Sequence, residues 1–176
     1  MKKEKKNKAP ENSLSYTKQL KWNKQEKAFW TKYFNNPPEP EAIPTHSNYL
    51  SFRSSDITDE EIGFLVNRIT SIEQLDLDDA YITKEAIKHL TRLKHIGELR
   101  LKGCTELYDD CVPYLVQLKC LKLLHLVGTN ITLGGLINMQ YLADLEKLFL
   151  YVNISEDISA KMLELKAQLP ICSFYI

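Results

Sequence analysis

The residue types that most often carry chemistry are scattered along this chain of 176 residues rather than grouped. They are the cysteines Cys104, Cys111, Cys120 and Cys172, and the histidines His46, His89, His95 and His125. No Cys-x-x-Cys or His-x-x-x-His pair occurs, so neither set has the spacing of a zinc site. The pairs Asp78–Asp79 and Asp109–Asp110 lack the spacing of an EF-hand loop. We therefore expect no metal and no cofactor, and we assign the acidic pairs to corners between strands and helices.

The short motifs of nucleophilic, metal-dependent and phosphate-transferring enzymes do not occur in the sequence. It contains no Gly-x-Ser-x-Gly and no His-Glu-x-x-His, and its six glycines leave little room for a phosphate-binding loop. Cys104 would need an open, electropositive setting to act as a nucleophile, and we expect it instead to be a small buried hydrophobe. We expect a protein with no catalytic residues; an enzyme would be expected to lose turnover on substitution of Cys104 or His125.

The elements that carry these residues follow from a repeat of alternating apolar pairs. The pairs begin at Leu50, Leu75, Leu99, Leu124, Leu148 and Cys172, in steps of 25, 24, 25, 24 and 24 residues. Alternation predicts short strands whose paired apolar residues point inward. A Thr or Ser and then apolar residues with helical spacing follow most pairs, which predicts a capped helix after each strand. The segment Thr58–Glu61, "TDEE", has the spacing of a capping box.

A strand and helix of this size cannot bury their own core, but a stack of them can. The step lies in the range of leucine-rich repeats. The segment 99–107, "LRLKGCTEL", resembles the LxLxxCxxI/L motif of cysteine-containing, ribonuclease-inhibitor-like repeats, and "GTNIT" followed by "GL" resembles their ITDxGL variant. Only Cys104 occupies the family's cysteine position, and Ala80 and Thr129 stand there in neighbouring units. More loosely, segment 100–118 is similar to small repeat proteins that accompany mitochondrial respiratory complexes.

The resemblance spans residues 48–176 and implies an α/β solenoid with a curved parallel sheet of about six strands and one helix per repeat. Residues 1–13 are polar and rich in lysine, which predicts a disordered basic tail. Residues 14–47 are expected to form an aromatic helix over 16–34 and then a proline-rich linker. Because an open solenoid end must be covered, this helix is expected to bury Trp22 and Trp30 against the first repeat as an N-terminal cap.

The charge balance bears on partners and compartment. The formal net charge is zero, with +7 over residues 1–36 and −7 over the remainder, so no general attraction to nucleic acid or membranes is expected. No stretch of about 18 apolar residues could cross a membrane, and no apolar segment of a secretory signal follows the basic start. We therefore expect a cytoplasmic protein with reduced thiols, no membrane partner and no small-molecule substrate.

In such a stack, strand residues between the buried ones face outward on the concave sheet. These positions are mostly polar or charged in the first repeats and become apolar and aromatic in the last ones, which often marks a protein-binding site. The predicted partner-binding residues are Arg100, Lys102, Leu123, His125, Val127, Lys147, Phe149, Tyr151 and Tyr175. Aromatic anchors would hold the partner, and Arg100, Lys102 and His125 would set charge complementarity.

The expected function is therefore non-catalytic binding of a protein partner on the concave face. An inhibitor or immunity-type protein that blocks an enzyme and an assembly accessory of a larger complex are both compatible with this pattern. The alternative is association with nucleic acid through the basic tail and the aromatic helix, which would weaken steeply with salt and disappear on deletion of residues 1–13.

Overall fold

Two compact units make up the chain, one ending at Ile43 and the other running from Pro44 to Ile176. The computed structural model describes residues 23–34, 39, 42–152 and 158–176. In the first unit, Asn23 accepts a hydrogen bond from the backbone N–H of Glu26 (2.6 Å) at the start of helix α1 (Lys24–Phe34), in the manner of a cap. Phe29 and Trp30 are buried and meet edge to face with ring centroids 5.0 Å apart. The predicted tail and Trp22 lie outside the described residues, and the capping role of α1 stays a prediction.

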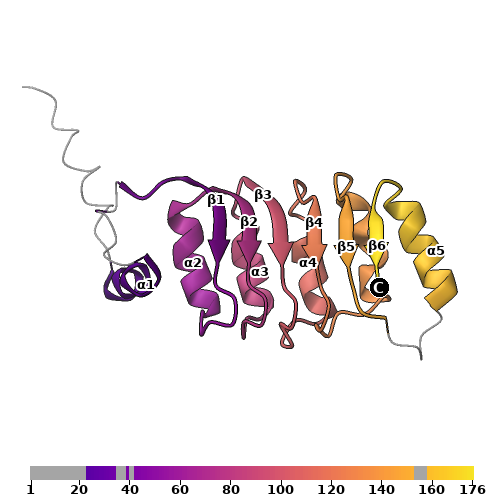
Figure 1. Ribbon diagram of the computed structural model, residues 1–176, viewed down its shortest axis with the longest axis horizontal. Coiled ribbons are helices and arrows are strands. Elements are labelled where there is room, and N and C mark those ends of the chain that lie inside the picture. The colour runs from indigo at the N-terminus through magenta and orange to yellow at the C-terminus, as the bar shows by residue number, and fades with distance from the viewer. Residues whose placement is uncertain (1–22, 35–38, 40–41, 153–157) are drawn as a thin grey trace, which may run out of the picture. The chain divides into compact units, whose positions relative to one another are not determined.

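The second unit contains one parallel sheet of six strands, which confirms the predicted α/β class and strand number (Figure 1). The strands are β1 (His46–Ser51), β2 (Ser71–Asp76), β3 (His95–Arg100), β4 (Leu123–His125), β5 (Lys147–Phe149) and β6 (Ser173–Tyr175). They lie in sequence order, so each strand pairs only with the strands that precede and follow it in the chain.

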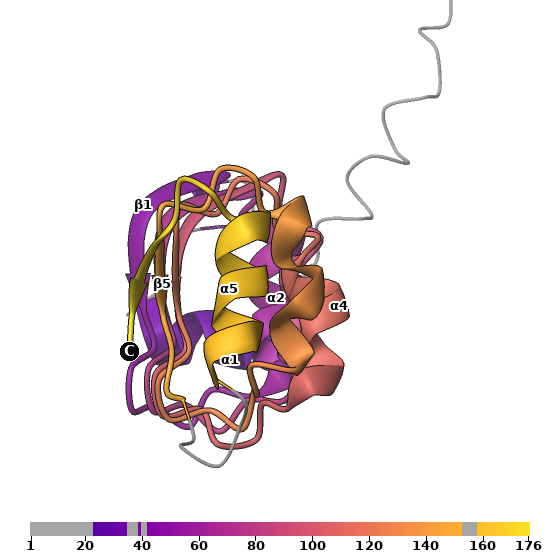
Figure 2. The ribbon, with the colours of Figure 1, turned by 90° about the vertical axis from the view of Figure 1, so that its right-hand side faces the viewer.

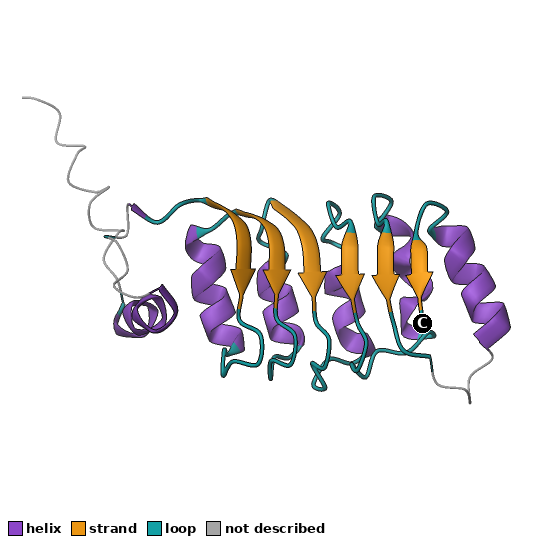
Figure 3. Cartoon of the chain, in the orientation of Figure 1, coloured by secondary structure: helices purple, strands orange, loops and turns teal. Residues whose placement is uncertain are grey.

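Helical segments connect these strands and lie together on one side of the sheet (Figures 2 and 3). They are α2 (Asp59–Arg68), α3 (Lys84–Leu90), a 3₁₀ turn (Asp109–Cys111) leading into α4 (Val112–Leu115), a 3₁₀ helix (Gly135–Tyr141) and α5 (Ile158–Gln168). Thr58 and Glu61 form the predicted capping box of α2. The connection between β4 and β5 is a 3₁₀ helix rather than the expected α-helix. It starts at Gly134–Gly135, and glycine disfavours the α-helix by about 1 kcal/mol per residue.

A row of apolar side chains crosses the sheet and faces the helices. The register places Leu50, Leu75, Leu99, Leu124, Leu148 and Phe174 side by side. The prediction that Cys172 continues this row is wrong, because Phe174 pairs with Leu148 and the last step is 26 residues. The N–H of Cys172 donates to the carbonyl of Leu169 (3.1 Å), so the turn after α5 takes up Cys172 before β6 begins. Alternation alone did not reveal this, because two residues that are two positions apart, such as Cys172 and Phe174, would point to the same face of a strand.

Within the second unit, successive strand–helix repeats are also joined at the helix starts by aspartate–threonine bridges. Asp59, the first residue of α2, accepts hydrogen bonds from the backbone N–H (2.8 Å) and the hydroxyl (2.6 Å) of Thr83, which precedes α3 in the next repeat. Asp109 makes the same two contacts with Thr132, at 2.7 Å and 2.8 Å. Each bridge therefore ties one helix start to the next with two charge-assisted hydrogen bonds.

We expect Asp59→Ala to lower the free energy of unfolding by about 1–3 kcal/mol, because the part-buried N–H of Thr83 loses its acceptor. The measurement is urea unfolding followed by far-ultraviolet circular dichroism. Glu60→Ala is the matched control, since it removes an exposed carboxylate from the same helical turn. Equal losses in the two variants would show that Asp59 acts only through the helix dipole.

Candidate protein-binding surface

Three rows of side chains lie on the sheet face opposite α2–α5, and together they define the outer face. The strand register aligns a first row of Tyr49, Gln74, Glu98, Leu123, Lys147 and Ser173, and a second row of Ser51, Asp76, Arg100, His125, Phe149 and Tyr175. Two residues further along the first five strands come Arg53, Asp78, Lys102, Val127 and Tyr151, which form the third row. The register thus brings the sequence-predicted site residues together on one face.

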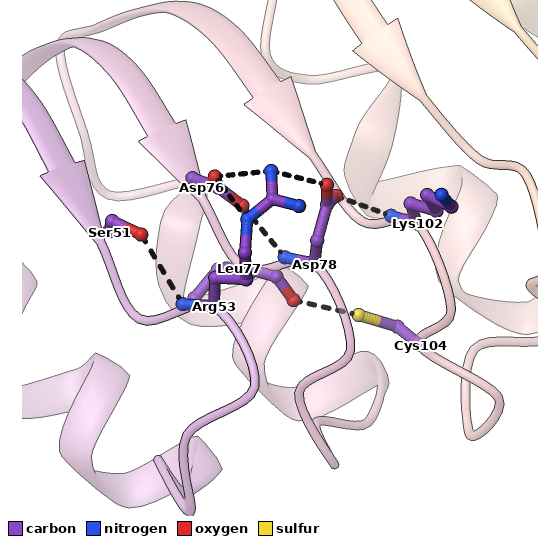
Figure 4. A network of polar contacts seen from close by, with 7 residues as sticks. All are labelled: Ser51, Arg53, Asp76, Leu77, Asp78, Lys102 and Cys104. Atoms are coloured by element: carbon purple, nitrogen blue, oxygen red, sulfur yellow. Dashed lines mark hydrogen bonds and ion pairs between the residues drawn. The ribbon is translucent and has the colours of Figure 1, made fainter.

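An ion-pair network with two buried carboxylates occupies the N-terminal part of the outer face (Figure 4). The Arg53 guanidinium donates to Asp76 Oδ2 through Nε (3.0 Å) and Nη2 (2.8 Å), and Nη2 lies 2.9 Å from Asp78 Oδ2. The other carboxylate oxygens accept backbone N–H groups, Asp76 Oδ1 from Asp78 (3.0 Å) and Asp78 Oδ1 from Lys102 (2.8 Å). Asp76 and Asp78 are only 3% and 1% exposed, so the two carboxylates are satisfied inside the protein.

Asp76 and Asp78 thus stand at polar positions of the outer face and yet are almost fully buried. Of the predicted corner pair Asp78–Asp79, only Asp79 lies at the corner between β2 and α3. Asp79 has a positive φ of 58°, as the corner residue Gly103 has in the next unit with 72°. The hydrogen bond to Asp76 raises the pKa of the Arg53 guanidinium, with the charges of Asp76 and Asp78 adding to the effect. Arg53 therefore stays charged, and its charge is engaged within the fold.

An aromatic row occupies the C-terminal part of the outer face. His125, Phe149 and Tyr175 are register partners on β4, β5 and β6. The Phe149 and Tyr175 rings are stacked, with centroids 4.3 Å apart and planes 12° apart, and His125 lies 5.0 Å from Phe149 with a tilt of 56°. Because the centroid separation matches the distance between neighbouring strands, the Phe149 and Tyr175 rings stack along the sheet and turn their edges outward. We call these three residues the aromatic row.

Exposure differs among the residues around the aromatic row. Tyr151 is 68% exposed and Tyr175 is 45% exposed, while Phe149 and Val127 are half-buried. The expectation that Leu123 is exposed is wrong, because it is only 8% exposed. Its register neighbours are Glu98 and Lys147, whose long aliphatic stems are able to cover an apolar side chain between them.

Basic residues flank the aromatic row. Arg100 lies beside His125 in the strand register, Lys102 follows in the third row, and Lys147 lies two residues before Phe149 on β5. Within the described part of the chain, none of these three side chains forms a salt bridge or hydrogen bond. Their charges are therefore directed to solvent or to a partner.

The pKa of His125 is lowered from its ordinary value of 6.5, first by burial and then by Arg100, Lys102 and Arg53, while Asp78 opposes the shift. On the β5 side the facing residue is Phe149, which adds no charge. His125 is consequently neutral at neutral pH.

We expect the free energy of unfolding to decrease as pH falls from about 7.5 to about 5.5, because the unfolded chain protonates His125 at a higher pH than the folded chain does. The stability is complete above the ordinary pKa and is lost as pH falls through it toward the lower folded value. Urea midpoints measured across this range should show a weaker dependence on pH for His125→Gln than for the wild type. The same pH dependence in both proteins would assign it to other groups.

The thiols lie outside this surface. Cys104 and Cys111 are buried, and burial raises the pKa of each thiol to about 12. The Cys104 thiol donates to the Leu77 carbonyl (3.1 Å), as Figure 4 shows. Cys172 is half-buried, and its burial raises its pKa to about 11. These three thiols are protonated at neutral pH and are poor nucleophiles.

One open pocket of about 380 Å³ lies at the middle of β1, β2 and β3, and it is lined by Asn48, Tyr49, Glu73, Gln74, Gly97, Glu98 and Lys122. A side chain at Gly97 would require the backbone to shift, since a Cβ there would lie 2.9 Å from the Glu73 carbonyl oxygen. Among the described residues, no three His, Cys, Asp or Glu side chains converge as a metal site, and no helix there is long and apolar enough to cross a bilayer.

Comparison with known proteins assigns no family to the chain. No protein-family model matches the chain, and no curated protein matches its sequence.

Proposed function

We propose that the chain is a non-catalytic protein-binding module whose outer face holds a protein partner. The observation that carries this proposal is the aromatic row with the exposed Tyr151 beside it, on a sheet face where solvated positions are ordinarily polar. Tyrosine and phenylalanine bury large areas at low cost in conformational entropy, which makes them frequent anchors at protein interfaces.

We also infer that the second unit is a leucine-rich repeat solenoid of the cysteine-containing, ribonuclease-inhibitor-like type, with the outer face as its concave side. The sequence-ordered sheet, the register steps of 24 to 26 residues and the buried Cys104 support this inference. All four cysteines are free thiols, which suits a reducing compartment such as the cytoplasm. An inhibitor and an assembly accessory would use such a face alike. The basic tail of the nucleic-acid alternative lies outside the described residues, so that alternative stays a prediction.

The test compares two double variants that remove equal numbers of aromatic rings. A partner recovered from native lysate with the wild-type chain is purified, and its affinity is measured by calorimetry. Phe149→Ala/Tyr151→Ala is expected to weaken binding about tenfold or more. Tyr81→Ala/Tyr108→Ala, which removes exposed rings from the loops after β2 and β3, is expected to leave it unchanged. Equal affinities of the two variants, both folded by circular dichroism, would overturn the proposal.

A further inference from the structure

We propose that the outer face recognises an acidic segment of its partner, in which a carboxylate lies next to an apolar side chain. This inference rests on the proposed function and adds the chemistry of the partner. It is carried by two independent features of the outer face, its unpaired basic residues and the orientation of its aromatic rings.

The basic residues beside the aromatic row are available to a partner because the neighbouring acids are already engaged. Asp76 and Asp78 are both paired with Arg53 and are almost fully buried. Arg100 is the last residue of β3, and Lys102 follows two residues later. Neither side chain consequently has a counter-charge within hydrogen-bonding distance in the described part of the chain. An arginine fork binds a carboxylate through two parallel hydrogen bonds, which is the geometry that an acidic side chain offers.

Lys147 extends the positive charge to β5, on the far side of His125. Among the described residues in this part of the outer face, one acidic residue, Glu98 in the first row, is outnumbered by three basic residues. These are Arg100, Lys102 and Lys147. Burial is the first cause of the lowered pKa of His125, and the nearby charges of Arg100 and Lys102 lower this pKa further, while Asp78 opposes the shift. A partner that brings negative charge to this region would satisfy charges that the fold leaves open.

The aromatic rings favour the same kind of partner. Phe149 is flanked by His125 on one side and stacked on Tyr175 on the other, so the row presents ring edges rather than ring faces to a partner. Ring edges carry partial positive charge, while ring faces carry partial negative charge. An outward row of edges thus offers apolar contact and attracts a carboxylate, and the exposed Tyr151 adds an apolar anchor beside it.

The same geometry disfavours single-stranded nucleic acid as the occupant of this surface. Bases are held by stacking on open ring faces. Phe149 and Tyr175 each have one face against the other, and the tilted His125 ring lies 5.0 Å from Phe149. The observations therefore favour a carboxylate-bearing peptide segment over a nucleic acid.

The experiment is a selection of random peptides of about twelve residues on the wild-type chain and on Arg100→Glu/Lys102→Glu. The wild type is expected to enrich peptides with Asp or Glu next to Leu, Phe or Trp, and the charge-reversed variant to lose this preference in favour of Lys and Arg. For one enriched acidic peptide, the dissociation constant is expected to rise about tenfold or more in the charge-reversed variant and to rise with salt. Lys119→Glu/Lys166→Glu, which reverses two exposed charges on the helical side, is the matched control and should keep the affinity.

The outcomes separate this inference from the proposed function. The selection could instead enrich apolar peptides without acidic residues. If these peptides bind Arg100→Glu/Lys102→Glu but no longer bind Phe149→Ala/Tyr151→Ala, the proposed function stands and the acidic segment is overturned. Peptides that bind all variants equally, or no enriched peptide at all, would overturn both. A short oligouridylate that binds more tightly than the enriched peptides, and is lost from the charge-reversed variant, would overturn the acidic segment in favour of nucleic acid.

Discussion

Arg53→Met is expected to lower the free energy of unfolding by about 3 kcal/mol, because it leaves the carboxylates of Asp76 and Asp78 without a counter-charge. Both carboxylates are almost fully buried, and each has one backbone N–H as its remaining donor. A buried charge that loses its partner costs about 3–5 kcal/mol. We expect the low end of this range, since water can enter where the half-exposed Arg53 side chain stood. The measurement is urea unfolding of both proteins at neutral pH.

Two further variants test whether the charge causes this loss. Arg53→Met/Asp76→Asn/Asp78→Asn removes both carboxylate charges but keeps a side-chain oxygen for each backbone N–H, and it is expected to recover most of the lost stability. Arg100→Met removes an arginine from the same face that has no ion pair in the described part of the chain, and a change of about 0.5 kcal/mol or less is expected. A loss in Arg53→Met no larger than that in Arg100→Met would contradict the assigned role of the network.

The network could have been read from the sequence once the repeat was known. Arg53 precedes Asp76 by 23 residues and Asp78 by 25, close to the repeat step, so opposite charges meet in neighbouring units. The same reasoning would have found the bridge between Asp59 and Thr83. What alternation does not reveal is burial, since it places Asp76 and Asp78 on the outer face without showing that Arg53 covers them.

The fold itself was predictable to the extent that apolar spacing determines it. Four of the five strand pairings follow from the apolar pairs, because a leucine ladder buried on one face admits no shift by one residue. The prediction failed for the fifth pairing, between β5 and β6, because a shift by two residues keeps the same face buried. That error also affected the site, since it placed Tyr175 beside Tyr151 instead of beside Phe149. The stacked pair of Phe149 and Tyr175 emerged only from the structure.

Leu99→Ala is expected to lower the free energy of unfolding by about 2–5 kcal/mol, through lost burial and the cavity left behind. Leu99 is 0% exposed and lies between Leu75 and Leu124 in the apolar row. Because each strand pairs only with its neighbours in sequence, β3 connects β1 and β2 to the strands of the aromatic row. The neighbouring repeats cannot close the cavity without shifting their own strands. The expected loss of unfolding free energy is therefore larger than at a site whose surroundings are able to collapse into the cavity.

Leu50→Ala is the matched control, because it removes the same atoms from the same row at the edge strand β1, where Leu50 is half-buried and has a register partner on one side only. Its expected cost is about 1–2 kcal/mol, since less apolar area leaves water on folding. Urea unfolding of both variants, followed by circular dichroism, measures the difference. A larger cost at Leu50 than at Leu99 would mean that the edge of the sheet, rather than its middle, holds the second unit together.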